Sequence, residues 1–353
     1  MPSFDPTNVN LDTASVEDIY CYLQLSENDY NGQLGARISS IFVILVTSSA
    51  CTLFPVVAKR IPRWNIPYPV YLFARYFGTG VIVATAFIHL LDPAYENIGT
   101  TTCVGVSGHW ADYSWCAAIV LASVIMVFLL DVASEVYVER IYGVEREHDA
   151  TDRFLIQASL IQSDDEYAVG GNSSGRKQPG SQETLSVESE RSFRQDIAAF
   201  LILEFGIIFH SVIIGLNLGV TGDEFATLYP VLVFHQAFEG LGIGARMSAL
   251  RFGQHRWLPW ILCMAYGLTT PISIAIGLGV RTTYNSGSKT ANMVQGVLNA
   301  ISAGILIYSG LVELLARDFL FDPDRTKRRS HLLGMLLCVL LGAGIMALIG
   351  KWA

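Results

Sequence analysis

Eight apolar stretches, each about 20 residues long, recur along this chain of 353 residues and constrain its fold more than any other feature. A helix of that length matches the hydrocarbon core of a bilayer, which is roughly 30 Å thick. The stretches cover residues 34–58, 70–91, 115–138, 197–220, 225–245, 258–280, 293–315 and 332–350. The sequence therefore predicts an all-α polytopic membrane protein with eight transmembrane helices.

The composition agrees with a membrane protein and excludes other classes. Hydrophobic residues make up 52% of the chain and charged residues only 15%, whereas soluble domains carry about 25% charged residues. The mean hydropathy is +0.42. A net charge of −8 argues against nucleic acid as a partner, because binding to phosphates requires a basic surface. We expect the lipid bilayer to be the main partner of the surface.

The polar segments divide the chain into five regions. They are an extracellular acidic N-terminal tail at 1–33, transmembrane helices at 34–138, a cytoplasmic disordered loop at 139–196, two transmembrane helices with the metal site at 197–245, and three transmembrane helices with a short extracellular C-terminus at 246–353. The orientation follows from the positive charges, because 18 of the 23 Lys and Arg residues fall in the loops after the first, third, fifth and seventh stretches. Such a bias places those loops in the cytoplasm and both termini outside.

Ionisable side chains in two neighbouring stretches predict a metal site. His210 lies in the fourth stretch, and His235 and Glu239 lie one helical turn apart in the fifth. Charged groups inside a membrane segment are costly, so they usually pair, bind an ion or line a water-filled path. Two imidazoles and a carboxylate suit Zn²⁺ or a similar divalent metal. The alternative is that each histidine is hydrogen-bonded to a carbonyl in a helix interface.

Weaker signals accompany these three residues. Gln236 and Ser211 each follow a histidine directly and are candidate ligands, although both residue types also join helices by polar packing. The GxxxG pairs Gly215–Gly219 and Gly240–Gly244 predict that the fourth and fifth helices approach each other closely.

Further polar residues in the apolar stretches are candidates for the path of the ion. They are His89, Asp92, Glu204, Asn217, Asn299 and Glu313. His89 and Asp92 are three residues apart at the outer end of the second stretch, where we expect an entrance. Asn299 and Glu313 belong to a polar stripe along the seventh stretch, which predicts a wetted wall. Helix caps and polar packing between helices are the alternatives.

The segments HSVIIGLNLG and HQAFEGLGIGAR closely resemble the ZIP (Zrt-like, Irt-like) family of divalent-metal transporters, in particular its fungal and plant branch. The resemblance extends to ATAFIHLL in the second stretch and to the eight predicted spans. It implies a homodimeric carrier with a 3+2+3 inverted-repeat arrangement in the plasma membrane. It also implies that the protein imports zinc, has no prosthetic group and is not an enzyme. The family's metal site would fall on His210, His235, Gln236 and Glu239, with Ser211 at an adjacent ligand position.

Two positions depart from the family pattern. Relatives with a two-metal centre carry carboxylates where this chain has Ile214 and Thr270, so we expect a single metal ion here. Within transport, the alternative substrate is Fe²⁺ or a broader range of divalent metals. A different class of protein, an intramembrane zinc-dependent hydrolase, is also conceivable from the residues, but the chain has no HExxH motif.

The six cysteines form no CxxC pair, so the sequence supports neither a zinc ribbon nor a thioredoxin-type site. Cys103 and Cys116 flank the short loop between the second and third stretches. A disulfide between them, or one to Cys21, is compatible with an oxidising outer face.

Overall fold

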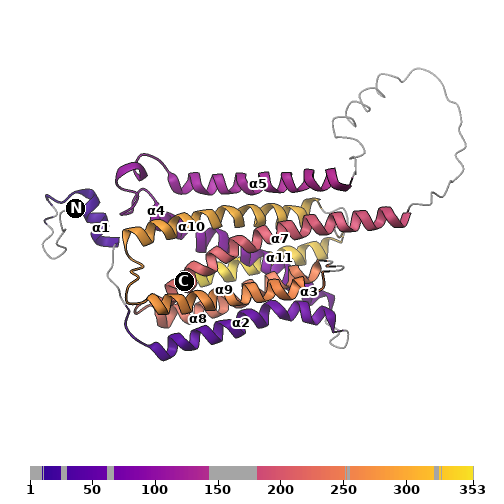
Figure 1. Cartoon of the computed structure of the whole chain (residues 1–353), viewed down its shortest axis with the longest axis horizontal. Coiled ribbons are helices and arrows are strands. Elements are labelled where there is room, and N and C mark those ends of the chain that lie inside the picture. The colour runs from indigo at the N-terminus through magenta and orange to yellow at the C-terminus, as the bar shows by residue number, and fades with distance from the viewer. Residues whose placement is uncertain are drawn as a thin grey trace, which may run out of the picture. The chain divides into compact units, whose positions relative to one another are not determined.

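The computed structural model describes residues 10, 12–24, 30–61, 67–142, 181–250, 252, 255–321, 326 and 328–352. Within these ranges every regular element is a helix (Figure 1). The elements are α1 (Val16–Gln24), α2 (Leu34–Arg60), α3 (Tyr68–Ala84), η3 (Thr85–Leu91), α4 (Asp92–Ile98), η4 (Gly108–Trp110), α5 (Trp115–Tyr142), α7 (Ser181–Val220), α8 (Phe225–Ala249), α9 (Leu258–Val280), α10 (Lys289–Tyr308), η5 (Ser309–Phe321), α11 (Arg329–Ile349) and η6 (Gly350–Trp352). The elements η3 and η5 are π-helical and continue α3 and α10.

Seven helical segments of the described chain are long and apolar enough to cross a membrane. They are Leu34–Arg60, Pro69–Ile98, Trp115–Tyr137, Asp196–Val220, Leu258–Val280, Lys289–Phe321 and Arg329–Trp352. Helix α8 is absent from this set although it has 25 residues, because the polar side chains of His235, Gln236 and Glu239 lower its hydropathy. All three of these residues are buried. An eighth span at α8 therefore stays a prediction.

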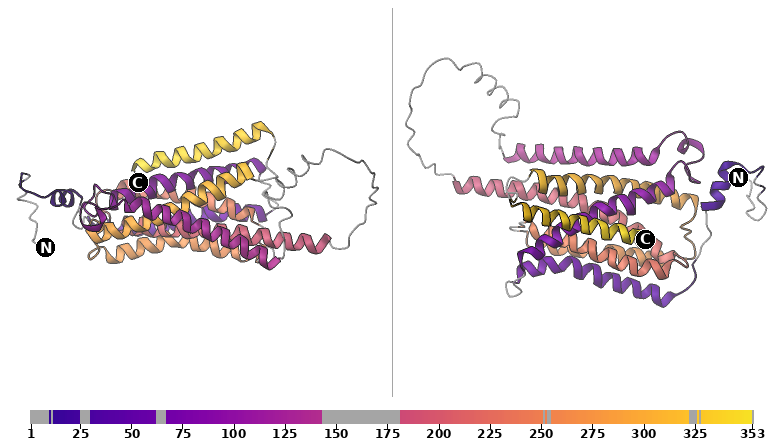
Figure 2. Two further views of the ribbon diagram at one scale, coloured as in Figure 1. Left: turned by 90° about the horizontal axis from the view of Figure 1, so that it is seen from above. Right: turned by 180° about the vertical axis from the view of Figure 1, so that it is seen from behind.

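The chain divides into two compact units, residues 1–129 with 199–353 and residues 130–198. The first unit contains every candidate site residue. Within it, α8 packs against α2 and α3, and α9 packs against α2 (Figure 1). Helix α11 packs against α3, and α10 packs against η3 and α4 (Figure 2). Helix α8, which carries two of the three predicted ligands, is therefore enclosed by other helices.

Helices extend into both ends of the predicted loop at 139–196. Helix α5 continues to Tyr142, and α7 begins at Ser181 instead of residue 197. The segment before 197 is rich in Glu, Gln and Arg, which favour helices even though they are polar. A search for apolar stretches misses such an extension. The predicted disorder of the remaining part, 143–180, lies outside the described residues.

The glycines of the two GxxxG pairs do not form the contact between α7 and α8 that the sequence predicted for them. Gly215 and Gly219 face α9, where an added Cβ would lie 2.7 Å from Ser273 Cβ and 2.8 Å from the Leu278 nitrogen, respectively. Gly240 and Gly244 face α2, and a Cβ on Gly244 would lie 2.1 Å from the Thr52 carbonyl oxygen. A small-residue face permits close packing but does not specify the partner.

Helix α1 is joined to the loop before α5 by a disulfide between Cys21 and Cys103. Ser107 Oγ donates a hydrogen bond to Glu17 Oε1 over 2.7 Å, and Lys289 Nζ lies 3.3 Å from the same oxygen. These two partners lower the pKa of Glu17 from its ordinary value. Since the lowered pKa favours the ionised carboxylate in the folded protein, this contact stabilises α1 at neutral pH and weakens as the pH falls through that pKa.

Among the pairings compatible with the sequence, the structure has the disulfide between Cys103 and Cys21. The free cysteines are Cys51, Cys116, Cys263 and Cys338. We therefore expect a thiol reagent to modify four cysteines in the denatured protein without reductant and six after reduction. Peptide mapping should find the unmodified pair at Cys21 and Cys103. Six reactive thiols without reductant, or a pair that contains Cys116, would contradict the assignment.

Candidate metal centre

The structure brings His210, His235 and Glu239 together between α7 and α8. The two Nε2 atoms of the histidines are 3.2 Å apart, and His235 Nε2 is 3.4 Å from Glu239 Oε1. One candidate ligand atom from each residue lies within 4.8 Å of the other two. A tetrahedral zinc ion about 2.0–2.1 Å from its nitrogen and oxygen donors holds them roughly 3.3 Å apart. The distances of His235 Nε2 to His210 Nε2 and to Glu239 Oε1 match that geometry for one ion.

The polar atoms of this group and of its neighbours have few partners. His210, His235 and Glu239 are at most 2% exposed. His210 Nδ1 and both carboxylate oxygens of Glu239 have no hydrogen bond within the described part of the chain. A buried carboxylate without a hydrogen bond is costly, and a bound cation removes that cost. The donor chemistry and the missing partners therefore both point to a divalent cation.

The two weaker candidate ligands are buried as well. Ser211 and Gln236 are both 0% exposed, and the Ser211 hydroxyl and the Gln236 amide have no hydrogen-bond partner among the described residues. Only the backbone carbonyl of Gln236 is engaged, by the Tyr266 hydroxyl at 3.3 Å. Polar packing between helices would engage these side-chain atoms in hydrogen bonds. Because they have no such partner, they are available to bind an ion or water.

His89 lies closer to this centre than the sequence suggested. Its ring centroid is 4.8 Å from that of His235, and the two rings are nearly perpendicular. His89 Nε2 is 3.4 Å from the carbonyl oxygen of Met346 in α11. The residue comes from the π-helical segment η3, which positions a third imidazole beside the centre.

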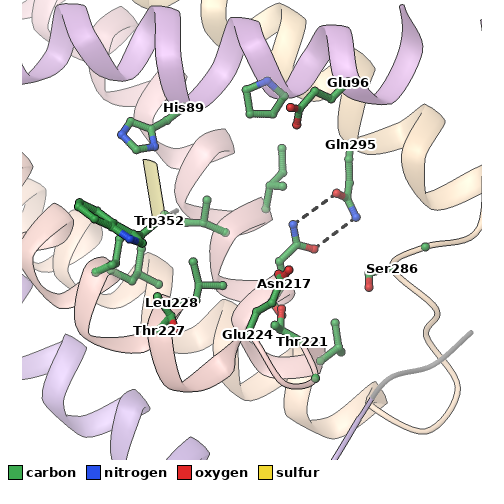
Figure 3. A pocket seen from close by; sticks show the side chains of 18 of the residues that line it. His89, Glu96, Asn217, Thr221, Glu224, Thr227, Leu228, Ser286, Gln295 and Trp352 are labelled. Carbon is green, nitrogen blue, oxygen red and sulfur yellow. Dashed lines mark hydrogen bonds between the residues drawn. The ribbon is translucent and has the colours of Figure 1, made fainter. Parts of the chain in front are cut away.

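A cavity of about 1230 Å³ borders the centre, and Figure 3 shows part of its wall, including His89, Glu96 and Asn217. Its wall includes His89, His210 and His235 together with Asn217 and Asn299. Two of the predicted ligands, His210 and His235, and three of the predicted path residues therefore line one cavity, whereas Glu239, Gln236 and Ser211 are not part of its lining. Its lining also contains the acidic residues Glu96, Asp223 and Glu224.

Asn217 and Gln295 form a reciprocal amide pair across this cavity, as the dashed lines in Figure 3 show. Each amide nitrogen donates to the other side chain's oxygen over 3.3 Å. The pair connects α7 with α10, so Asn217 has a hydrogen-bonded role in the cavity wall.

Asp92 does not line the cavity, contrary to the entrance predicted from its spacing to His89. It is exposed and begins α4, directly after η3. A π-helical turn contains more than four residues, so positions three apart no longer share a face. Pro93 and Glu96, four and seven residues after His89, line the cavity instead. Glu96 is not among the predicted path residues, although residues seven apart share a face in an α-helix, so its spacing from His89 was a usable signal.

Glu204 and Glu313 are also outside this cavity. Glu204 is 3% exposed, and both of its carboxylate oxygens lack a hydrogen-bond partner within the described ranges. Glu313 accepts a hydrogen bond from Arg317 Nη1, one turn further along η5, over 3.3 Å. The polar stripe predicted for the seventh stretch is therefore divided, because Asn299 faces the cavity and Glu313 does not.

The helices and this centre define a class of protein, a multi-pass membrane protein with a buried group of candidate metal ligands beside a polar cavity. Comparisons with known proteins agree with that class. A family model described as ZIP Zinc transporter matches residues 34–350. Zinc-regulated transporter 1 of Saccharomyces cerevisiae is 56% identical to this chain, over 99% of the chain and 97% of the yeast protein.

Two more distant relatives extend the match. Zinc-regulated transporter 1 of Schizosaccharomyces pombe is 41% identical over 98% of this chain and 92% of its own length. Zinc transporter 5 of Oryza sativa is 31% identical over 96% of this chain and 93% of its own length. The chain belongs to the ZIP zinc transporter family. It is a membrane transporter and not an enzyme, as the sequence predicted, and its metal ion is a substrate instead of a resident cofactor.

Proposed function

We propose that this protein imports Zn²⁺ into the cytoplasm through His210, His235 and Glu239. The observation that supports this most strongly is the spacing of 3.2 and 3.4 Å between donor atoms of three buried residues on two helices. The names of the yeast and rice relatives agree with zinc as the substrate. In this proposal His210, His235 and Glu239 are the main ligands, and Gln236 and Ser211 are weaker ones. Such a site releases its ion more readily than a closed site with four strong ligands.

The cavity is the outer part of the path in this proposal. Glu96, Asp223 and Glu224 line it and raise the local concentration of cations. The ion then passes Asn217 and Asn299 and loses its water at His89 and the three ligands. Glu204, which has no hydrogen-bond partner among the described residues and is buried in α7, is the next carboxylate on the inner side.

The finer organisation is part of the same proposal. Helix α8 is the eighth transmembrane helix, and the helices form the 3+2+3 inverted-repeat arrangement of a homodimer. The distribution of Lys and Arg supports an orientation with both termini outside and the 139–196 region in the cytoplasm. The plasma membrane is the proposed location, since the acidic N-terminal region and the Cys21–Cys103 disulfide suit an extracellular face.

Accumulation of radioactive zinc in cells that lack their own importer tests this function. We expect cells that express the chain to accumulate zinc against a vector control, and unlabelled Zn²⁺ to compete better than Fe²⁺ because two imidazoles favour zinc. Stronger competition by Fe²⁺ would favour the iron alternative. Zinc that copurifies with the protein but never accumulates in the cells would contradict transport.

A further inference from the structure

A second group of charged side chains lies outside the metal centre and links three elements. Arg75 Nη2 of α3 is 2.7 Å from Asp318 Oδ1 of η5, and Arg246 Nη2 of α8 is 3.4 Å from Asp318 Oδ2. Arg246 Nη2 also donates a hydrogen bond to Thr79 Oγ1 of α3 over 2.8 Å. The side chains of Arg246 and Asp318 are only 12% and 8% exposed. We call Arg75, Arg246 and Asp318 the charged cluster.

The charged cluster lies on the side of the metal centre away from the cavity. Helix α8 contributes Thr227 and Leu228 to the cavity wall, then His235 to the centre, and then Arg246 to the cluster. Arg246 is 11 residues beyond His235, which corresponds to about 16 Å along an α-helix. No member of the charged cluster lines the cavity. In the proposed orientation the cluster is on the cytoplasmic side.

Helices α3 and α8 are in close contact between the centre and the charged cluster. A Cβ on Gly242 would lie 2.6 Å from Gly78 Cα, and the Phe77 and Phe238 rings meet edge to face with centroids 5.4 Å apart. These contacts close the seam between α3 and α8 beyond Glu239. Passage of an ion along the seam to the cytoplasmic side therefore requires α8 to separate from α3.

The charge of the cluster opposes the passage of a cation. Two guanidinium groups face one carboxylate, so the cluster carries a net positive charge with all three groups ionised. A divalent cation that moved inward along the seam would be repelled by this net charge. The same cluster that joins the helices therefore also blocks the ion.

The contacts of Asp318 are arranged so that it keeps a partner when α8 moves. Only Arg246 comes from α8, whereas Arg75 and Thr79 come from α3, which packs against η5. Withdrawal of α8 would break the contacts of Arg246 with Asp318 and Thr79 but leave the pair of Arg75 and Asp318 intact. A buried carboxylate left without a partner would destabilise the separated state strongly. Arg75 avoids that cost.

We propose that Arg246 is the inner latch of the transporter: its contacts with Asp318 and Thr79 hold α8 against α3 and η5 while the metal centre is reached from the cavity, and they break when the ion is released inward. Asp318 remains paired with Arg75 in the released state. The assignment of inner and outer sides rests on the proposed function, but the pairing and its asymmetry do not.

A cysteine at Ala74 reports on this latch. Ala74 is 7% exposed and lies one turn before Gly78 on α3, on the face that meets α8. In Ala74→Cys protein in inside-out membrane vesicles, the rate of modification by a membrane-impermeant thiol reagent measures how often α8 separates from α3. The same chain with Ala74 retained corrects for the native cysteines.

Arg246→Gln and Asp318→Asn each remove the latch, so both should raise the modification rate of Cys at position 74 at least about tenfold, the factor that corresponds to 1.4 kcal/mol. Arg75→Gln should lower the rate instead, since Asp318 would then lose its only partner in the separated state. Arg246→Lys keeps the charge and should lie between the parent and Arg246→Gln. A rise in the modification rate for Arg246→Gln and Asp318→Asn, together with a fall for Arg75→Gln, distinguishes a latch from a general loss of packing.

Unchanged modification in Arg246→Gln and Asp318→Asn protein would overturn the latch. A rise in all three neutral variants, including Arg75→Gln, would also overturn it, because it would show that the cluster only supports the fold. Thermal unfolding of each purified variant identifies proteins that fail to fold, and the intermediate Arg246→Lys then carries the test. Thiol modification does not depend on zinc. A failure of the parent to transport zinc would therefore contradict the proposed function, whereas the modification rates would still test the latch.

Discussion

Replacing His235 or Glu239 by alanine is expected to reduce zinc uptake by about 100-fold or more, since loss of a group that only orients a metal ligand already costs about 10–100-fold. Each substitution removes one of three donors that lie 3.2–3.4 Å from their neighbours. Glu239→Gln should be nearly as damaging, because it keeps the shape of the side chain but removes the negative charge that compensates the cation. His210→Ala should behave like the other two alanine variants.

Radioactive zinc uptake, corrected for the amount of protein at the cell surface, measures this effect. His331→Ala is a matched control because His331 is an exposed histidine at the start of α11. It should transport zinc like the parent. Normal uptake in His235→Ala and Glu239→Ala protein would eliminate the centre. Zinc content of the purified variants would show whether the ion is lost from the site or only released more slowly.

Gly78→Leu is expected to destabilise the protein and to abolish most transport. A Cβ at Gly78 would lie 2.1 Å from Gly242 Cα and 3.1 Å from the Gly242 nitrogen, so the backbones of α3 and α8 would have to separate. Overpacking in a close-packed interior costs about 1–3 kcal/mol, and a contact between two backbones cannot relax by a change of rotamer. The displaced α8 would also move His235 and Glu239 away from His210.

Thermal unfolding of the purified protein and zinc uptake both measure this change. Gly344→Leu on α11 is the control, because an added Cβ there meets nothing within 4 Å. We expect the control to retain the unfolding temperature and uptake of the parent. A Gly78→Leu protein with the stability and uptake of the parent would show that α3 and α8 are not in the described contact.

Much of the architecture and the central part of the site were predictable from the sequence. Long apolar runs are forced into helices in lipid, because every backbone polar group there must be paired internally. His235 and Glu239 are one helical turn apart, so their common face follows from helix geometry alone. Their approach to His210 depends on whether the fourth and fifth helices are neighbours, which the spacing of residues along one helix does not determine.

Other features depend on local geometry or on the choice of partner. The expected shared face of His89 and Asp92 assumed an α-helix, but η3 is π-helical, and Asp92 is not part of the cavity lining. Gly240 and Gly244 indicate close packing, and only the structure shows that α2 is the partner.

By itself the sequence determined an all-α membrane protein with imidazole and carboxylate donors buried in two helices, because apolar run length and helical periodicity are local properties. Only the tertiary structure decided which helices meet, which acidic residue faces the cavity, and that Arg75, Arg246 and Asp318 come together. Those residues are separated by up to 243 positions, and their proximity depends on how whole helices pack. Local sequence patterns do not specify which distant helices pack against each other.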